Sequence, residues 1–227
     1  TRKAVTFSLL GAFAVLILVV IATLTTPLLA VQQLRITGLK TISEKQIQRA
    51  LKDQIGVPLA LVNQQQVVDK LSTFTKIESV SLVAELPHTL RVSITERSPI
   101  AIVVVAGTAY LYDPAGIRLG RAGVGDLYPV INSSGEPANS ASFKEAIAVL
   151  LALPQNLLSR VASVNATSTD NVTLQLRGYS GQRIIWGDAS EGILKSRVLS
   201  ALMANQKPND RVTFDVSSPR APVVRYR

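Results

Sequence analysis

Side chains that could perform catalysis are scarce in this sequence. The chain has one histidine, His88, one methionine and no cysteine. A Cys/His zinc site, a pair of haem ligands, a cysteine nucleophile and a disulfide framework are therefore absent or nearly so. His88 follows Pro87 directly at the expected start of a strand, and no spacing around it suggests a Ser-His-Asp triad. We predict that His88 is a surface residue.

The acidic residues do not form a catalytic pattern either. They stand singly at expected turns and helix starts, where capping and the helix dipole account for them, and nothing favours a glycosidase pair. Gly120, Gly123 and Gly125 lie close together, but they lack the Lys-Ser/Thr of a phosphate-binding loop. We expect no catalytic, cofactor or metal site and no small-molecule substrate. The acidic residues considered are Asp113, Asp126, Asp188, Glu191 and Asp215.

The composition is that of a folded, basic protein. The 24 Lys and Arg against 15 Asp and Glu give a net charge of +9, and 47% of the residues are hydrophobic, which excludes a disordered chain. The positive charge would draw an exposed domain toward anionic lipids or acidic wall polymers. Because the basic residues are dispersed without interleaved aromatics, we interpret them as a solvated surface and expect no nucleic-acid partner.

An apolar segment near the N-terminus predicts one membrane crossing. No charged residue occurs between Lys3 and Arg35, and Ala4–Leu24 is almost wholly apolar. As a helix this stretch would be about 31 Å long, close to the hydrocarbon thickness of a bilayer. A cleaved signal peptide is the alternative, but its apolar region is only about 7 to 15 residues long. We predict a transmembrane helix over residues 4–26.

The charges that flank this segment predict its orientation. Arg2 and Lys3 precede it, so the positive-inside bias places the N-terminus in the cytoplasm and the rest of the chain outside. Because the chain begins with Thr1, we interpret residues 1–3 as the remnant of a longer cytoplasmic segment. The prediction is a single-pass type II protein of the plasma membrane.

Residues 31–98 predict a small domain with the order β-α-α-β-β. A strand runs to Gly38, Ser43 and Gln46 have the spacing of a capping box that opens a helix, and a second helix follows Asn63. Two strands joined at Pro87 complete the domain, and both helices need one face of the sheet to bury their apolar stripes. The side chains expected to share a face are Ile47, Ala50 and Leu51 in the first helix and Val80, Leu82, Ala84 and Leu86 in the strand before Pro87.

Residues 99–227 predict a second, β-rich domain with two helices, so the whole chain is of the α+β class. Asp113–Gly116 has the residue order of a type I turn. Ser142 and Glu145 have capping-box spacing and predict the start of the first helix. The second helix is expected over residues 190–204. Its expected buried face consists of Leu194, Val198, Ala201 and Leu202.

Three segments of the first domain carry a resemblance to a known family. Leu34–Gly38, Gly56–Leu59 and Leu86–Pro99, the last with its Glu96-Arg97-Ser98-Pro99 ending, resemble the FtsQ/DivIB family of bacterial division proteins. The β-α-α-β-β order likewise resembles a POTRA domain. The resemblance implies a POTRA domain at 31–98, a β domain at 99–227, and a non-enzymatic divisome scaffold at the division septum that binds other division membrane proteins.

The C-terminus contains the remaining candidate for a binding site. Two β-prone runs, 211–216 and 221–226, predict a hairpin whose last strand lies at a sheet edge. The pattern alone favours a mere closing hairpin, with Pro219, Pro222 and Arg225 as edge protection. The resemblance implies that the edge pairs by β-strand addition with an FtsB/DivIC-type partner, accompanied by an FtsL-type protein. The residues implied are Val212, Phe214, Val216, Val223, Val224, Arg225 and Tyr226.

Two other functions remain open at this point. A POTRA-bearing chaperone or translocation factor for exported polypeptides would bind many unfolded peptides at the first sheet. A membrane-anchored wall hydrolase would need a polar cleft with paired carboxylates or a nucleophile beside a base.

Overall fold

The computed structural model describes residues 11–18, 29–132, 137–168, 170–179, 181–204, 206–207 and 210–226. Within these ranges, no helix has both the length and the apolar character needed to cross a membrane. The predicted cytoplasmic remnant, and all of the predicted transmembrane segment except the helical residues 11–18, lie outside the described residues. Tertiary contacts divide the chain between Arg97 and Ser98 into two units, each described by itself below.

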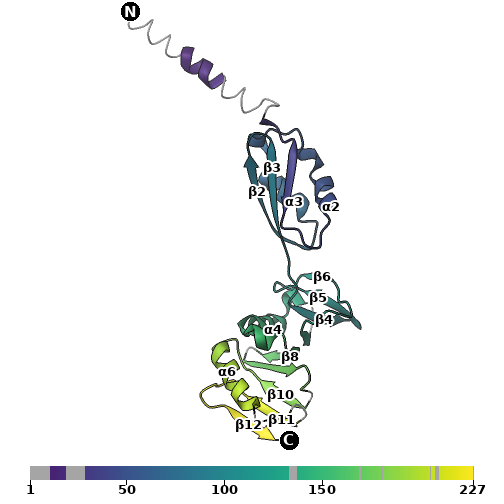
Figure 1. The fold of residues 1–227 in the computed structure, drawn as a ribbon, viewed down its shortest axis with the longest axis vertical. Coiled ribbons are helices and arrows are strands. Elements are labelled where there is room, and N and C mark those ends of the chain that lie inside the picture. Colours follow the sequence, from purple (N-terminus) through teal and green to yellow (C-terminus); the bar gives the residue numbers. More distant parts are fainter. Residues whose placement is uncertain are drawn as a thin grey trace, which may run out of the picture. The chain divides into compact units, whose positions relative to one another are not determined.

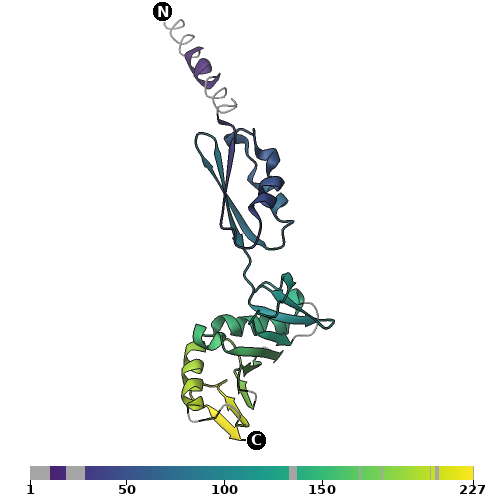
Figure 2. The same ribbon diagram turned by 45° about the vertical axis from the view of Figure 1, so that its right-hand side comes forward.

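The first unit has the predicted order of elements and a three-stranded sheet (Figure 1). The central strand β3 pairs in parallel with β1 and antiparallel with β2. Helices α2 and α3 cover one face of this sheet (Figure 2). The elements are β1 Gln33–Thr37, α2 Glu44–Ala50, the 3-10 turns η2 Lys52–Gln54 and η3 Leu59–Leu61, α3 Gln64–Leu71, β2 Ile77–Glu85 and β3 Thr89–Glu96.

The core of this unit forms between the apolar face of strand β3 and the apolar faces of the two helices. Every second side chain of β3 is buried, from Leu90 through Val92 to Ile94. Helices α2 and α3 bury residues four apart, a spacing that puts them on one face of a helix. These core residues are Ile47 in α2, Leu51 at its C-cap, and Val67 and Leu71 in α3.

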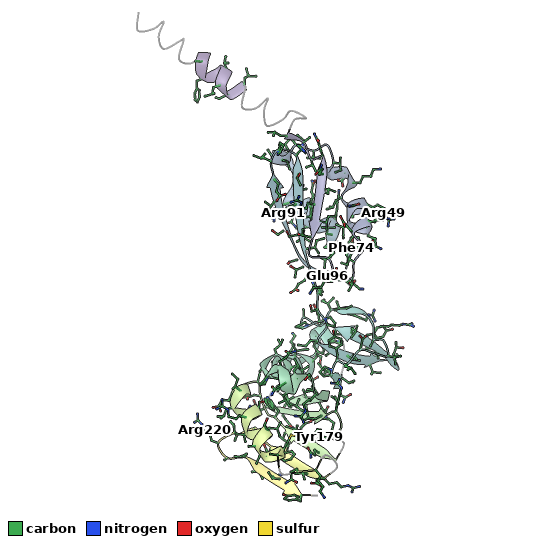
Figure 3. The ribbon with its side chains drawn as sticks, in the orientation of Figure 1. Arg49, Phe74, Arg91, Glu96, Tyr179 and Arg220 are labelled. Atoms are coloured by element: carbon green, nitrogen blue, oxygen red, sulfur yellow. The ribbon has the colours of Figure 1, made fainter. Side chains whose placement is uncertain are left out.

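Glu96, at the end of β3, anchors the loop between β1 and α2. Its carboxylate accepts hydrogen bonds from the backbone N–H groups of Lys40, Thr41 and Ile42, at 2.7–3.1 Å, and from the Thr41 hydroxyl. Burial alone would raise the pKa of Glu96, but these donors outweigh it and lower the pKa to about 2. Figure 3 labels Glu96 at this end of the sheet. The Glu of the Glu-Arg-Ser-Pro segment therefore has a structural role.

Two local predictions for the first unit are wrong. Ser43 is the N-cap residue of α2, but its side chain makes no capping hydrogen bond, so the predicted capping box with Gln46 is not formed. Ala84 and Leu86, predicted on the buried face of the strand, are both exposed, and Leu86 lies in the turn after β2. The Asn63 prediction is confirmed, because its side chain accepts a hydrogen bond from Gln66 N and caps α3.

The second unit is a nine-stranded mixed sheet with α4 and α6 along one side (Figure 2). The strand order is β12-β11-β10-β9-β8-β7-β4-β5-β6. Its elements are β4 Ala101–Val105, β5 Thr108–Tyr112, β6 Arg118–Arg121, β7 Val130–Asn132, η4 Pro137–Asn139, α4 Ala141–Ala152, α5 Gln155–Leu158, β8 Val161–Ser168, β9 Asn171–Leu176, β10 Gln182–Ile185, α6 Gly192–Met203, β11 Val212–Asp215 and β12 Val223–Tyr226.

One continuous core lies between the helices and this sheet. Phe143 of α4 packs edge-on against Tyr112 of β5, with ring centroids 6.1 Å apart, and Phe214 and Trp186 are fully buried. A Cβ at Gly192 would collide with the carbonyl oxygen of Ala152, so the start of α6 lies against the end of α4. The predicted α+β class is confirmed, with the short α5 as a third helix of this unit.

The predicted start of α4 is displaced by two residues. Ser140, and not Ser142, is the N-cap residue, and its hydroxyl accepts a hydrogen bond from Phe143 N at 3.2 Å. Ser142 lies inside the helix, where its hydroxyl contacts that of Ser140 at 2.8 Å. The capping-box spacing of Ser142 and Glu145 therefore predicted the helix but not its first residue.

The predicted buried face of α6 is only partly confirmed: Val198 and Leu202 pack against the core without being fully buried. The buried residues are Lys195, Ser196 and Leu199. The predicted face is only partly buried, and Ala201 is exposed. The helix is rotated about its axis because a lysine, which the hydropathy pattern assigns to solvent, is enclosed by the protein.

Candidate partner-binding edge

Strand β12 is an edge strand formed by the closing hairpin of the second unit. It pairs antiparallel with β11 over all four of its residues, from Val212 opposite Tyr226 to Asp215 opposite Val223, without a register shift. A turn with Ala221 N bonded to Ser218 O at 3.0 Å precedes it. No other strand pairs with β12 in the sheet as described. The predicted hairpin and its edge position are confirmed.

The residues implied in β11 cannot offer a free edge. This strand lies between β10, to which it is parallel, and β12. Val212, Phe214 and Val216 are all fully buried. Their position is a correction to the implied site: these side chains form the core beneath β12, and only β12 has a backbone edge to share.

The register shows which backbone groups of β12 point outward. Val216, directly after β11, donates its N–H to Ile185 O of β10 at 2.9 Å. The even-numbered residues of β11 therefore direct their backbone groups toward β10. The odd-numbered Thr213 and Asp215 then face β12 and bond to Arg225 and Val223. The intervening residues of β12, Val224 and Tyr226, therefore direct their N–H and C=O groups away from the sheet.

Side chains of β12 divide between the two faces of the sheet. Val224 is half-buried against the core, opposite Phe214. Tyr226 is on the same face and is 72% exposed, with its hydroxyl 3.0 Å from Gln206 Nε2, which donates to it. Val223, 42% exposed, and Arg225 are on the opposite face. The edge thus presents apolar, aromatic and cationic side chains around its unpaired backbone.

An ion pair beside β10 holds the helix that connects it to β11. Lys195 of α6 is fully buried, and its Nζ donates to the Asp188 carboxylate at 2.7 Å and to the Asp188 carbonyl at 3.0 Å. The bond from Lys195, and a further one from Ser190, lower the pKa of Asp188 to about 2. Sequence analysis missed this pair; the only signal was a lysine within an otherwise apolar stripe of α6.

The other acidic side chains considered for chemistry have local structural roles. Asp113 Oδ1 accepts from Ile117 N at 2.7 Å in the predicted turn, and Asp126 accepts from Gly123 N at 2.7 Å. Asp215 accepts from Ser217, and Glu191 lies 3.4 Å from Arg220. Within the described part of the chain, no three His, Cys, Asp or Glu residues are grouped so as to hold a metal ion.

His88 lies in the turn between β2 and β3 of the first unit, whereas the acidic residues considered for chemistry belong to the second unit. It is half-buried rather than fully exposed, and its carbonyl oxygen accepts hydrogen bonds from the N–H groups of Gln32 and Gln33, at 2.8 and 3.2 Å. These bonds involve its backbone, so the position of His88 is explained by chain packing.

Comparison with known proteins agrees with this architecture. Residues 29–97 match the family model described as "POTRA domain, FtsQ-type". Proteins named "Cell division protein FtsQ" from Mycobacterium leprae and Mycobacteroides abscessus are 31% and 30% identical over 88% of this chain. The protein of that name from Streptomyces venezuelae is 28% identical over 85% of it.

The first unit is thus a POTRA domain of the FtsQ type. The relatives extend across the second unit as well, so the chain is similar to FtsQ cell division proteins over both units. The chain spans 57% of the length of the M. leprae relative and 63% of that from M. abscessus. The Streptomyces protein is covered over 73% of its length.

Proposed function

We propose that this chain is a non-enzymatic scaffold of the bacterial division machinery, anchored by residues 4–26 in the plasma membrane at the septum. Its N-terminus is cytoplasmic, and both folded units are extracytoplasmic. It acts by binding other division membrane proteins, an FtsB/DivIC-type protein and its FtsL-type companion. The FtsQ-type POTRA domain and the similarity to cell division proteins support the role in division, and the apolar, charge-free segment before Arg35 supports the anchor.

The observation that carries the binding mechanism is the unpaired backbone of β12. An extended segment of the partner adds to this edge as a tenth strand and bonds to the outward-facing groups of Val224 and Tyr226. Main-chain hydrogen bonds of about 1 kcal/mol each give affinity. The side chains of Val223 and Arg225 on one face, and of Tyr226 on the other, give specificity.

Proline at position 224 tests this mechanism. Val224→Pro removes an outward-facing donor and leaves the ladder between β11 and β12 intact, because Val223 and Arg225 make those bonds. We expect affinity for the FtsB/DivIC-type partner to fall by about tenfold or more, which corresponds to about 1.4 kcal/mol. Titration of the purified proteins in detergent or nanodiscs measures the change.

Two controls separate the backbone effect from other effects of proline. Val224→Ala keeps the donor and removes most of the side chain. Arg121→Pro places a proline at the opposite edge of the same sheet. There Ala122 N bonds to Ala109 O of the neighbouring strand, so the backbone groups of the adjacent Arg121 point away from the sheet. Both controls should bind the partner with nearly wild-type affinity. Arg121→Ala accompanies Arg121→Pro to account for the loss of charge. Unchanged affinity in Val224→Pro would contradict strand addition at β12.

A further inference from the structure

The POTRA domain has one end at which three segments meet around the start of β1. Val31 exchanges backbone hydrogen bonds with the 56–57 loop, through Val57 O at 2.9 Å and Gly56 N at 2.8 Å. The carbonyl of His88, in the turn between β2 and β3, accepts from Gln32 and Gln33. The residues that follow the N-terminal apolar segment are thus flanked by loops 55–61 and 86–88, which we call the apical loops (Figure 1).

The apical loops expose large apolar side chains. Ile55 is 46% exposed, Leu61 60% and Leu86 75%. Across residues 29–97, all of which the structure describes, the one other exposed large hydrophobic residue is Val83, three positions before Leu86 on β2. Exposed apolar surface in this domain is therefore concentrated at the end where the chain enters.

Charge is absent from the same end. No charged residue occurs from Gln54 to Val68, nor between the apolar segment and Arg35. At the border of the apical loops, Asp53 forms an ion pair with Lys70, and Glu85 forms one with Arg91, which Figure 3 labels. Arg35 is 3.6 Å from Glu85. An uncharged apolar cap bordered by paired charges is suited to a lipid interface, where isolated charges are costly.

We infer that the apical loops of the POTRA domain insert into the interfacial region of the bilayer that the N-terminal segment crosses. The inference rests on the proposed membrane anchor. The residues from Pro27 to Ala30 can span at most about 14 Å, so the chain holds this end of the domain near the membrane surface. Apolar side chains of interfacial segments reach about 5–10 Å into the boundary between headgroups and acyl chains. Ile55, Leu61 and Leu86 are the inserting residues.

Single-site labelling of the full chain tests the inference. The sequence contains no cysteine, so Leu86→Cys and Leu61→Cys each introduce one labelling site, at exposed positions where folding should be preserved. Thr75→Cys is the matched control, at an exposed position on the loop before β2. The next residue, Lys76, accepts a hydrogen bond from Arg97 N, which places this loop at the other end of the domain from the apical loops. Each variant carries an environment-sensitive NBD probe and is reconstituted in phosphatidylcholine vesicles with or without doxyl-labelled lipid.

We expect the probes at positions 86 and 61 to emit at shorter wavelength and to be quenched by doxyl lipid, while the probe at position 75 is unaffected. If the protein floats with the vesicles but all three probes behave alike, the membrane anchor stands and the insertion of the apical loops is overturned. If the protein does not float with the vesicles, the anchor and this inference are both overturned.

Discussion

The two edges of the nine-stranded sheet differ in the regularity of their strands. At one edge, β12 matches β11 residue for residue. At the other, the pairing of β6 with β5 shifts register between Leu111 and Tyr112, and Gly120 adopts a φ of +151°, outside the range that other residues favour. Arg118 and Arg121 begin and end this irregular strand.

This difference indicates which edge can accept a further strand. A bulge interrupts the row of backbone donors and acceptors, and charged side chains discourage pairing, so β6 has the features of a protected edge. Strand β12 is short and carries Pro222 and Arg225 nearby, but its four paired residues are regular and its free groups are evenly spaced. In the proposed mechanism, β6 is the protected edge of the sheet and β12 is the edge that accepts the partner's strand.

The largest effect is expected from removing the core beneath the open edge. Phe214→Ala deletes a fully buried ring that lies opposite Val224 and should lower the free energy of unfolding by about 3–4 kcal/mol. Partner affinity should fall with it, because β12 loses the surface on which it rests. Urea denaturation measures the loss, and Phe214→Leu, which fills most of the volume, should cost far less. An unchanged midpoint for Phe214→Ala would show that β12 is not supported by this residue.

A smaller effect is expected from the backbone of the protected edge. Gly120→Ala should cost about 1–2 kcal/mol, because no atom lies within 4 Å of the added Cβ and the penalty comes from the positive φ alone. Gly125→Ala also adds a methyl group in open space, but without a positive φ, and should be nearly neutral. Thermal denaturation of the two variants compares them. Equal stability would mean that β6 is not fixed in its irregular conformation, and the contrast with β12 would weaken.

The smallest of these effects should come from the ion pair beside β10. Asp188→Asn leaves the buried Lys195 ammonium without a carboxylate, and we expect a loss of about 1 kcal/mol at neutral pH, since the Asp188 side chain is partly exposed to solvent and screened. The low pKa of Asp188, about 2 against 3.8, means that its contribution is present above pH 4 and lost as the pH falls through 2.

Denaturation curves at several pH values check this prediction. The difference in stability between wild type and Asp188→Asn should be constant from pH 7 to about pH 4 and shrink below it. Glu191→Gln, which removes a more exposed contact with Arg220, is the matched control and should show no such dependence. A difference that persists undiminished at pH 2 would assign the effect of Asp188→Asn to packing instead.

Much of the fold could be predicted from local sequence, but the full buried face of α6 could not. Asn63 before an apolar helical stripe correctly predicted α3, and the turn at Asp113–Gly116 was confirmed by the bonds of Asp113. The face of α6 was predicted only in part, because Lys195 is buried where its Nζ bonds to Asp188, seven positions earlier. The hydropathy of Lys195 does not reveal that a partly exposed carboxylate will pair with it in the folded protein.

For the binding edge, the sequence by itself determined that the chain ends in two alternating strands joined by a proline-containing turn. Only the tertiary structure decided that β11 is interior, that β7 lies between β4 and β8, and that Val224 and Tyr226 direct their backbone groups outward. The physical reason is that a period of two describes one strand at a time. Which strands become neighbours depends on contacts between segments far apart in the chain, and those arise only when the core is packed.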